Sequence, residues 1–152
     1  MNSETTKVLR YHCKRLGINY PINAAPLERF SYLVAKMESD LDTQAKNPTS
    51  SAKGMYQFID GSIQPAINRV RRALGDAPWL ASLEIHGDIR KFGPDKQTAL
   101  FLGNILEMKG TDPAIMNIAM TGDVGVMKQL YAEKHHTKPD EATLTRMDLV
   151  FS

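Results

Sequence analysis

Apolar residues recur at helical spacing along most of this chain of 152 residues. The first pattern predicts a helix over residues 4–16, which ends at Gly17 because glycine tolerates the left-handed conformation found at helix ends. The next pattern predicts a helix that opens near Pro26 and runs to Glu38, and the helical pattern then breaks into a cluster of turn-forming residues over 47–51. Its apolar stripe consists of Leu27, Phe30, Leu33, Val34 and Met37.

Further helices are predicted along the rest of the chain. Ser62 is placed to cap a third long helix that closes at Gly75, and residues 76–93 have an irregular pattern with room for a short helix. Later helices are predicted from Pro94 to Gly110, from Asp112-Pro113, around residues 124–131 and from Pro139. Residues 55–59 are consistent with either a short helix or a short strand. We therefore expect one domain over residues 1–152, mainly α, with about seven helices and little or no β-structure.

The composition is that of a soluble globular protein. The 19 Lys and Arg residues and 17 Asp and Glu residues leave a formal net charge of +2, which gives no electrostatic reason to expect nucleic acid as a partner. The chain has no apolar run of about 18 residues, and its start, Met1 to Thr6, is polar, so we expect no membrane segment and no signal peptide. Cys13 has no partner for a disulfide within the chain, which is compatible with a reducing compartment.

Metal and nucleotide sites have no candidate in the sequence. Asp40 and Asp42 resemble the start of a calcium loop, but Ala45 stands where that loop needs glycine. The chain has no phosphate-binding loop, no dinucleotide motif and no serine nucleophile motif. The histidines are isolated or adjacent in sequence, and none has metal-ligand spacing: His12, His86, His135 and His136. We therefore expect no metal and no cofactor.

Glu38 is the one side chain that the pattern singles out for chemistry. It lies four residues after Val34 and eleven after Leu27, on or at the edge of the buried face of its helix. Partial burial there would raise the pKa of the carboxyl toward the range in which it can donate a proton near neutral pH. The alternative is an ordinary glutamate at a helix end whose side chain reaches water.

The residues that follow Glu38 resemble a known signature. In lysozyme-like lytic transglycosylases, which include goose-type-lysozyme-like enzymes, a Glu-Ser pair ends a helix and is followed by a Ser/Asn-Pro turn and a Gly-x-x-Gln-Phe-like segment. The matching residues here span roughly 30–63, about a fifth of the chain, and the Asn-Pro-Thr-Ser-Ser form looks most like cell-wall-degrading enzymes of bacteriophages. They are Glu38-Ser39 and Asn47-Pro48-Thr49-Ser50-Ser51-Ala52-Lys53-Gly54-Met55-Tyr56-Gln57-Phe58.

This resemblance implies a lysozyme-like helical domain with a cleft that binds peptidoglycan glycan strands. It makes Glu38 the sole catalytic acid and base, in a substrate-assisted cleavage that yields a 1,6-anhydro sugar. It also implies a phage protein that is made in the host cytoplasm or carried in the virion, with other virion proteins as candidate partners. The residues implied to bind substrate are Ser39, Asn47, Gly54, Met55, Tyr56, Gln57 and Phe58, with Tyr56 or Met55 expected to pack on a sugar face.

Two departures from the family pattern leave alternatives open. Many members have serine where this chain has Asn47, and the nearest candidate for a later Ala-Tyr-Asn-Ala-Gly-like motif, residues 119–123, has neither the tyrosine nor the asparagine. Tyr56 or Tyr131 could take the place of that tyrosine. The other candidate functions are a hydrolase, a catalytically inactive virion or wall-binding protein, and a helical nucleic-acid-binding module. In the hydrolase, one of three residues would supply the second carboxylate: Asp40, Asp42 or Asp60.

Overall fold

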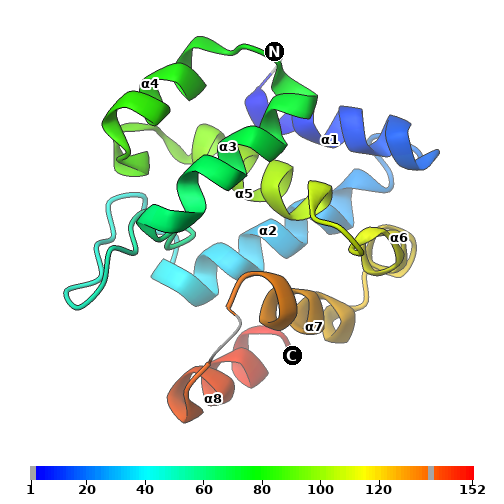
Figure 1. Cartoon of the computed structure of the whole chain (residues 1–152). Helices are drawn as coiled ribbons and strands as arrows, with labels where there is room; N and C mark the ends of the chain where they lie inside the picture. Colours follow the sequence, from blue (N-terminus) through cyan, green and yellow to red (C-terminus); the bar gives the residue numbers. More distant parts are fainter. Residues whose placement is uncertain (1–2, 137–138) are drawn as a thin grey trace.

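Helices make up most of the described part of the chain, residues 3–136 and 139–152, in a computed structural model (Figure 1). Met1 and Asn2, part of the polar start, lie outside these residues. The elements are α1 (Glu4–Leu16), α2 (Ala24–Ser39), α3 (Asp60–Leu74), α4 (Pro78–His86), the short 3-10 helix η1 (Ile89–Lys91), α5 (Pro94–Glu107), α6 (Asp112–Thr121), α7 (Val124–Lys134) and α8 (Glu141–Val150). The only β-structure within the described ranges is two isolated bridges, between Lys46 and Lys53 and between Lys53 and Phe58. The prediction of a mainly α fold is confirmed.

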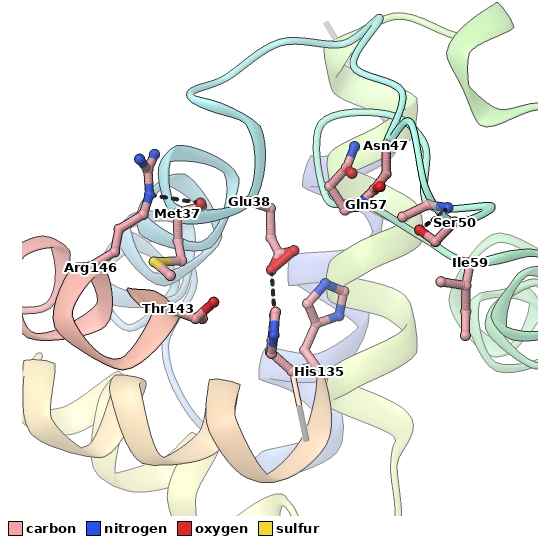
Figure 2. Close-up of a pocket in the computed structure, with 11 residues that line it drawn as sticks. Met37, Glu38, Asn47, Ser50, Gln57, Ile59, His135, Thr143 and Arg146 are labelled. Carbon is pink, nitrogen blue, oxygen red and sulfur yellow. Dashed lines mark hydrogen bonds and ion pairs between the residues drawn. The ribbon is translucent and has the colours of Figure 1, made fainter. Parts of the chain in front are cut away.

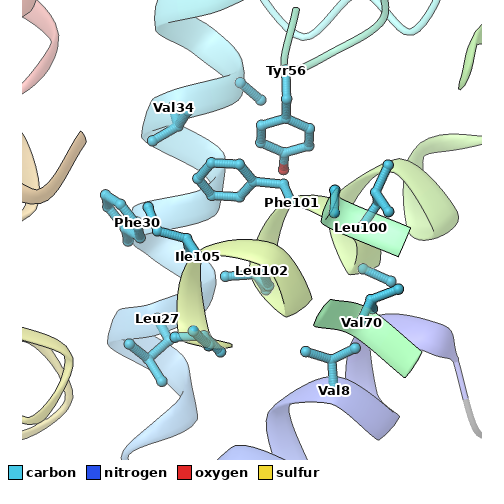
Figure 3. Packing of buried hydrophobic residues seen from close by; sticks show 14 of the residues in the cluster. Val8, Leu27, Phe30, Val34, Tyr56, Val70, Leu100, Phe101, Leu102 and Ile105 are labelled. Atoms are coloured by element: carbon cyan, nitrogen blue, oxygen red, sulfur yellow. The ribbon is translucent and has the colours of Figure 1, made fainter. Parts of the chain in front are cut away.

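Helix α5 lies at the centre of the fold and packs against α1, α2 and α3. Nine of its residues are buried, so it is apolar on nearly all sides rather than along one stripe. Phe101 from this helix stacks on Tyr56, with 4.4 Å between the two ring centroids (Figure 3). The centroid of the Phe101 ring also lies 5.8 Å from that of Phe30 on α2. This aromatic group joins α2, α5 and the loop before α3 into one core.

The contact between α3 and α5 is unusually close. Gly103 of α5 faces Val70 of α3, and a β-carbon built on Gly103 would lie 2.2 Å from Cγ2 and 3.1 Å from Cα of Val70. Glycine is therefore required there to let the two helices approach, rather than to allow a special backbone angle.

Several boundaries differ from the sequence prediction. Helix α3 begins at Asp60, before Ser62, and the backbone N–H of Asp60 donates to Ser51 Oγ at 2.9 Å, a contact from the preceding loop. Helix α4 is the short helix for which the irregular segment over residues 76–93 left room, and Nε1 of its Trp79 donates to Glu4 Oε2 at 3.0 Å. Helix α8 begins at Glu141, after Pro139, with Asp140 as its N-cap.

The end of α2 is fixed by the last helix of the chain. Arg146 of α8 donates from Nη2 to the carbonyl of Lys36 at 2.9 Å and from Nε to the carbonyl of Met37 at 3.1 Å. Carbonyl groups in the last turn of a helix have no partner within the helix, so a cation that binds them stabilises the helix end. No helix in the described ranges is both long and apolar enough to span a membrane.

Candidate active site

Glu38 lies in the last turn of α2 and lines a pocket of about 510 Å³, here called the Glu38 pocket. The pocket is formed by the end of α2, the loop over residues 47–59, the end of α7 and one face of α8. Figure 2 shows Glu38 between Thr143 and Arg146 on one side and Asn47 and Gln57 on the other. The remaining lining residues are Met37, Ser50, Ala52, Ile59, His135 and His136. Glu38 is the only carboxylate among these lining residues.

Two side chains bind the same oxygen of Glu38. The hydroxyl of Tyr131 donates to Oε1 at 2.5 Å, and Nδ1 of His136 lies 3.0 Å from the same atom. Tyr131 is fully buried, and the Glu38 side chain is 9% exposed. Within the described part of the chain Oε2 accepts no hydrogen bond, so this oxygen is the one available to a ligand. Of the two tyrosines considered from the sequence, Tyr131 is the one whose hydroxyl contacts Glu38.

The expectation of a raised pKa for Glu38 is wrong for this arrangement. Burial is the largest single cause and raises the pKa, but the hydrogen bonds from His136 and Tyr131 and the two nearby histidine rings together lower it by more, so the pKa of Glu38 lies below its ordinary value. The hydrogen bond to Glu38 in turn raises the pKa of His136, and the carboxylate of Asp140 acts in the same direction. Burial and the charge of Glu38 raise the pKa of Tyr131, which therefore keeps its proton. Between the lowered pKa of Glu38 and the raised pKa of His136, the site holds a carboxylate and an imidazolium in contact.

The neighbouring histidine has a different role. Nε2 of His135 donates to the carbonyl of Tyr56 at 2.7 Å, and the His135 ring lies edge-on against Phe58 and Phe101. This packing lowers the pKa of His135, which favours the neutral ring with its proton on Nε2. His135 thus joins the end of α7 to the loop before α3. The sequence indicated only that His135 and His136 face different directions, and it gave no sign that His136 reaches Glu38.

The structure divides the predicted substrate-binding residues into two groups. The side chains of Asn47 and Gln57 line the Glu38 pocket. Ser39 does not line it, because its Oγ donates to the carbonyl of Met55 at 2.8 Å and accepts from the backbone N–H of Asp42 at 3.0 Å. Ser39 therefore connects the end of α2 to the loop that forms the opposite wall.

Gly54 also shapes this wall rather than lining it. Its φ is 81°, a left-handed conformation, and a β-carbon there would lie 2.7 Å from Gln97 Oε1 and 2.8 Å from Ile89 Cγ2. The same Gln97 oxygen accepts the backbone N–H of Met55 at 2.7 Å. Glycine at this position lets the loop lie against α5 and η1, and the Gly54 carbonyl accepts from Gln57 Nε2 at 2.9 Å.

The expectation that Met55 or Tyr56 packs on a sugar is wrong, because both side chains belong to the core. Tyr56 is 1% exposed, its hydroxyl bonds Thr98 at 3.0 Å, and burial raises its pKa to about 12. Phe58 is also buried, although it lines a second pocket beside the first. Apolar residues in a short segment have the same sequence signature whether they face a core or a ligand.

The three aspartates considered as second carboxylates lie outside the Glu38 pocket. Asp40 is exposed and ends α2 in a left-handed conformation, and Asp42 accepts the backbone N–H of Gln44 at 2.9 Å. Asp60 lines a separate pocket near α4, with its carboxylate 3.4 Å from Lys53 Nζ. None of them lines the Glu38 pocket, so the pocket offers no second carboxylate beside Glu38.

The chemistry of the site therefore depends on Glu38, Tyr131 and His136. Among residues 3–136 and 139–152, no group of three or more histidine, cysteine, aspartate or glutamate side chains could hold a metal ion. Acid and base catalysis by a single carboxylate is what this arrangement can perform. Comparison of the chain with protein families, curated proteins and solved structures finds no match.

Proposed function

We propose that this protein is a peptidoglycan lytic transglycosylase, which cleaves the bond between N-acetylmuramic acid and N-acetylglucosamine. The observation that carries the proposal is that Glu38 is the only carboxylate lining a pocket of about 510 Å³, with one oxygen bound by Tyr131 and His136. Retaining and inverting glycosidases usually need two carboxylates flanking the scissile bond. A substrate-assisted reaction needs one. The resemblance of residues 38–58 to phage cell-wall-degrading enzymes supports the same reaction.

In the proposed reaction, the proton of the neutral Glu38 carboxyl goes to the glycosidic oxygen as the bond from that oxygen to C1 of the muramic sugar breaks. The N-acetyl carbonyl of that sugar stabilises the positive charge at C1. The ionised Glu38 then accepts the proton of the sugar's own 6-hydroxyl, whose oxygen bonds to C1. The product is a 1,6-anhydro sugar, and no water is consumed. Tyr131 and His136 stabilise the carboxylate between the two proton transfers.

The low pKa of Glu38 is compatible with an acid role because His136 is its partner. Two groups this close titrate as a pair, and the pair retains one proton until the pH passes the raised pKa of His136. That proton resides on the imidazole ring in the free protein and is available to Glu38 when a sugar displaces water from the pocket. Among the residues that the structure describes, His135, Asp140, Tyr131 and Arg146 are further titratable or charged groups near the pair.

The proposal is tested by mass spectrometry of the fragments that the protein releases from purified peptidoglycan. We expect fragments that end in 1,6-anhydro-muramic acid, which are lighter by one water than the corresponding reducing-end fragments. Reducing-end fragments would instead indicate hydrolysis, with a water molecule held by groups other than Asp40, Asp42 and Asp60. The absence of fragments at every pH tested, with binding to sacculi retained, would favour the wall-binding alternative.

Substitution of His136 tests the shared proton. In the variant His136→Gln only Glu38 can hold the proton of the pair. Loss of His136 removes two causes that lower the pKa of Glu38, but we expect this pKa to stay below the raised pKa of His136 in the wild type. The pH at which cleavage declines on the alkaline side is therefore expected to move to lower values, and the rate at neutral pH to fall about tenfold or more. The measurement is kcat/KM across the pH range.

His86→Gln is the matched control for this variant, because His86 is exposed and lies outside the Glu38 pocket. Its pH profile should coincide with that of the wild type. If the profile of His136→Gln has the same shape as the wild type and differs only in height, His136 positions Glu38 and does not share its proton.

A further inference from the structure

A second pocket of about 330 Å³ lies beside the Glu38 pocket. The two pockets share three lining residues, Gln57, Ile59 and His135, which form the boundary between them. The far side of the second pocket is formed by the first turns of α3, by Asn104 and Met108 near the end of α5, and by Lys134 at the end of α7. We call it the Arg69 pocket, after the arginine of α3 that lines it. The two pockets are therefore adjacent.

The charges of the Arg69 pocket all have the same sign. Arg69 and Lys134 line it, and no aspartate or glutamate does. Neither cation forms an ion pair within the described residues, whereas Arg71 and Arg72 of the same helix are paired with Glu84 and Glu107. The pocket therefore attracts an anion.

Arg69 is held in place by a buried amide. Asn104 is 5% exposed, and its Oδ1 accepts from Arg69 Nη1 at 2.9 Å. Nε and Nη2 of Arg69, and Nδ2 of Asn104, have no hydrogen-bond partner in the described structure. A guanidinium fixed through one nitrogen still has N–H donors for both oxygens of a carboxylate. Because the Arg69 side chain is already ordered in the free protein, it loses less conformational entropy when a ligand binds.

Resting on the proposed function, we infer that the Arg69 pocket binds a carboxylate of the stem peptide carried by the glycan strand. The sugar rings of the strand are N-acetylated and uncharged, so they have no group that selects two unpaired cations. The stem peptide is attached to the muramic sugar at the scissile bond and carries free carboxylates. The enzyme therefore prefers strands that retain their peptides.

The test compares kcat/KM on soluble, uncross-linked glycan strands with intact stem peptides and on the same strands after an amidase has removed the peptides. The wild type is expected to prefer the peptide-bearing strands, and this preference should weaken as salt is added. Arg69→Gln should reduce the ratio of the two values about tenfold, the effect of losing one charge-assisted contact. Lys134→Gln, which leaves the bond between Arg69 and Asn104 intact, should reduce it in the same direction.

Arg72→Gln is the matched control, because Arg72 lies on the same helix and outside the pocket, with a side chain 70% exposed. It should leave the ratio unchanged, and thermal unfolding should show that all three variants fold. Equal wild-type rates on the two substrates, or an equal loss on both in Arg69→Gln, would overturn the inference. The second result would assign the pocket to a sugar.

Binding by the Glu38→Gln protein separates this inference from the proposed function. Its affinity for the two strand preparations can be measured by fluorescence anisotropy without any cleavage. Tighter binding of peptide-bearing strands that disappears in Glu38→Gln/Arg69→Gln supports the subsite even if the wild type releases no fragments. Equal affinity for both preparations overturns the subsite whether or not the wild type cleaves.

Discussion

Glu38→Gln is expected to lose at least about 1,000-fold in kcat on peptidoglycan, because one group is both the acid and the base of the proposed reaction. The amide has nearly the shape of the carboxyl group, and its oxygen can accept from Tyr131. The fold should therefore be retained. The measurements are the rate of fragment release and the thermal unfolding midpoint of the same preparation.

The same substitution at Glu28 is the control for Glu38→Gln. Glu28 is exposed on α2, away from the pocket, so its variant should cleave at the wild-type rate. A Glu38→Gln protein that retains cleavage within about tenfold of the wild type would remove Glu38 from the catalytic role, since acid and base catalysis contribute more than that. A protein that is inactive because it is unfolded would be identified by its lost unfolding transition.

Gly103→Ala is expected to destabilise the fold by about 3 kcal/mol, the upper part of the range for overpacked cores. The added methyl group would lie 2.2 Å from Cγ2 of Val70 and 3.1 Å from its Cα, so α3 and α5 must move apart. For a chain of this size, a loss of that magnitude lowers the unfolding midpoint by roughly 6–12 °C. Calorimetry or circular dichroism measures it directly.

Two further variants isolate the cause of this loss. Gly61→Ala places a methyl group on α3 where nothing lies within 4 Å, so it should leave stability unchanged or raise it slightly. Val70→Ala creates the space that the methyl group of Gly103→Ala needs, so the double variant should lose less stability than the two single variants added together. Full additivity would show that the helix contact is not the source of the effect.

The helices were predictable where a local pattern determines them. The stripe from Leu27 to Met37 and the glycine after Leu16 lie within single elements, and the structure has α2 and α1 there. Helix α4 was not predictable from such a stripe, because its Trp79 is anchored by Glu4, 75 residues earlier. The first turn of α3 likewise depends on Ser51, in the loop before it.

The site was predictable only in part. The position of Glu38 followed from its place at the end of an apolar stripe, but the direction in which its pKa is shifted did not. That direction is set by Tyr131 and His136, which are 93 and 98 residues away in the chain. No local pattern around a carboxyl group reveals partners that only tertiary packing brings to it. For the same reason, Tyr56 was indistinguishable from a ligand-binding aromatic until its stacking on Phe101 was known.

The Glu38 carboxylate lies between two separate parts of the chain. Oε1 is bound by α7 and the residue that follows it, whereas the wall formed by Asn47 and Gln57 belongs to a loop between α2 and α3. One hydrogen bond, from His135 to the carbonyl of Tyr56, connects these two parts directly. The pKa of Glu38 is thus set by a different segment from the one that forms the Asn47 and Gln57 wall of its pocket. Under the proposed function, substitutions that accumulate in residues 47–52 would change which strands bind while leaving the partners of Glu38 Oε1 in place.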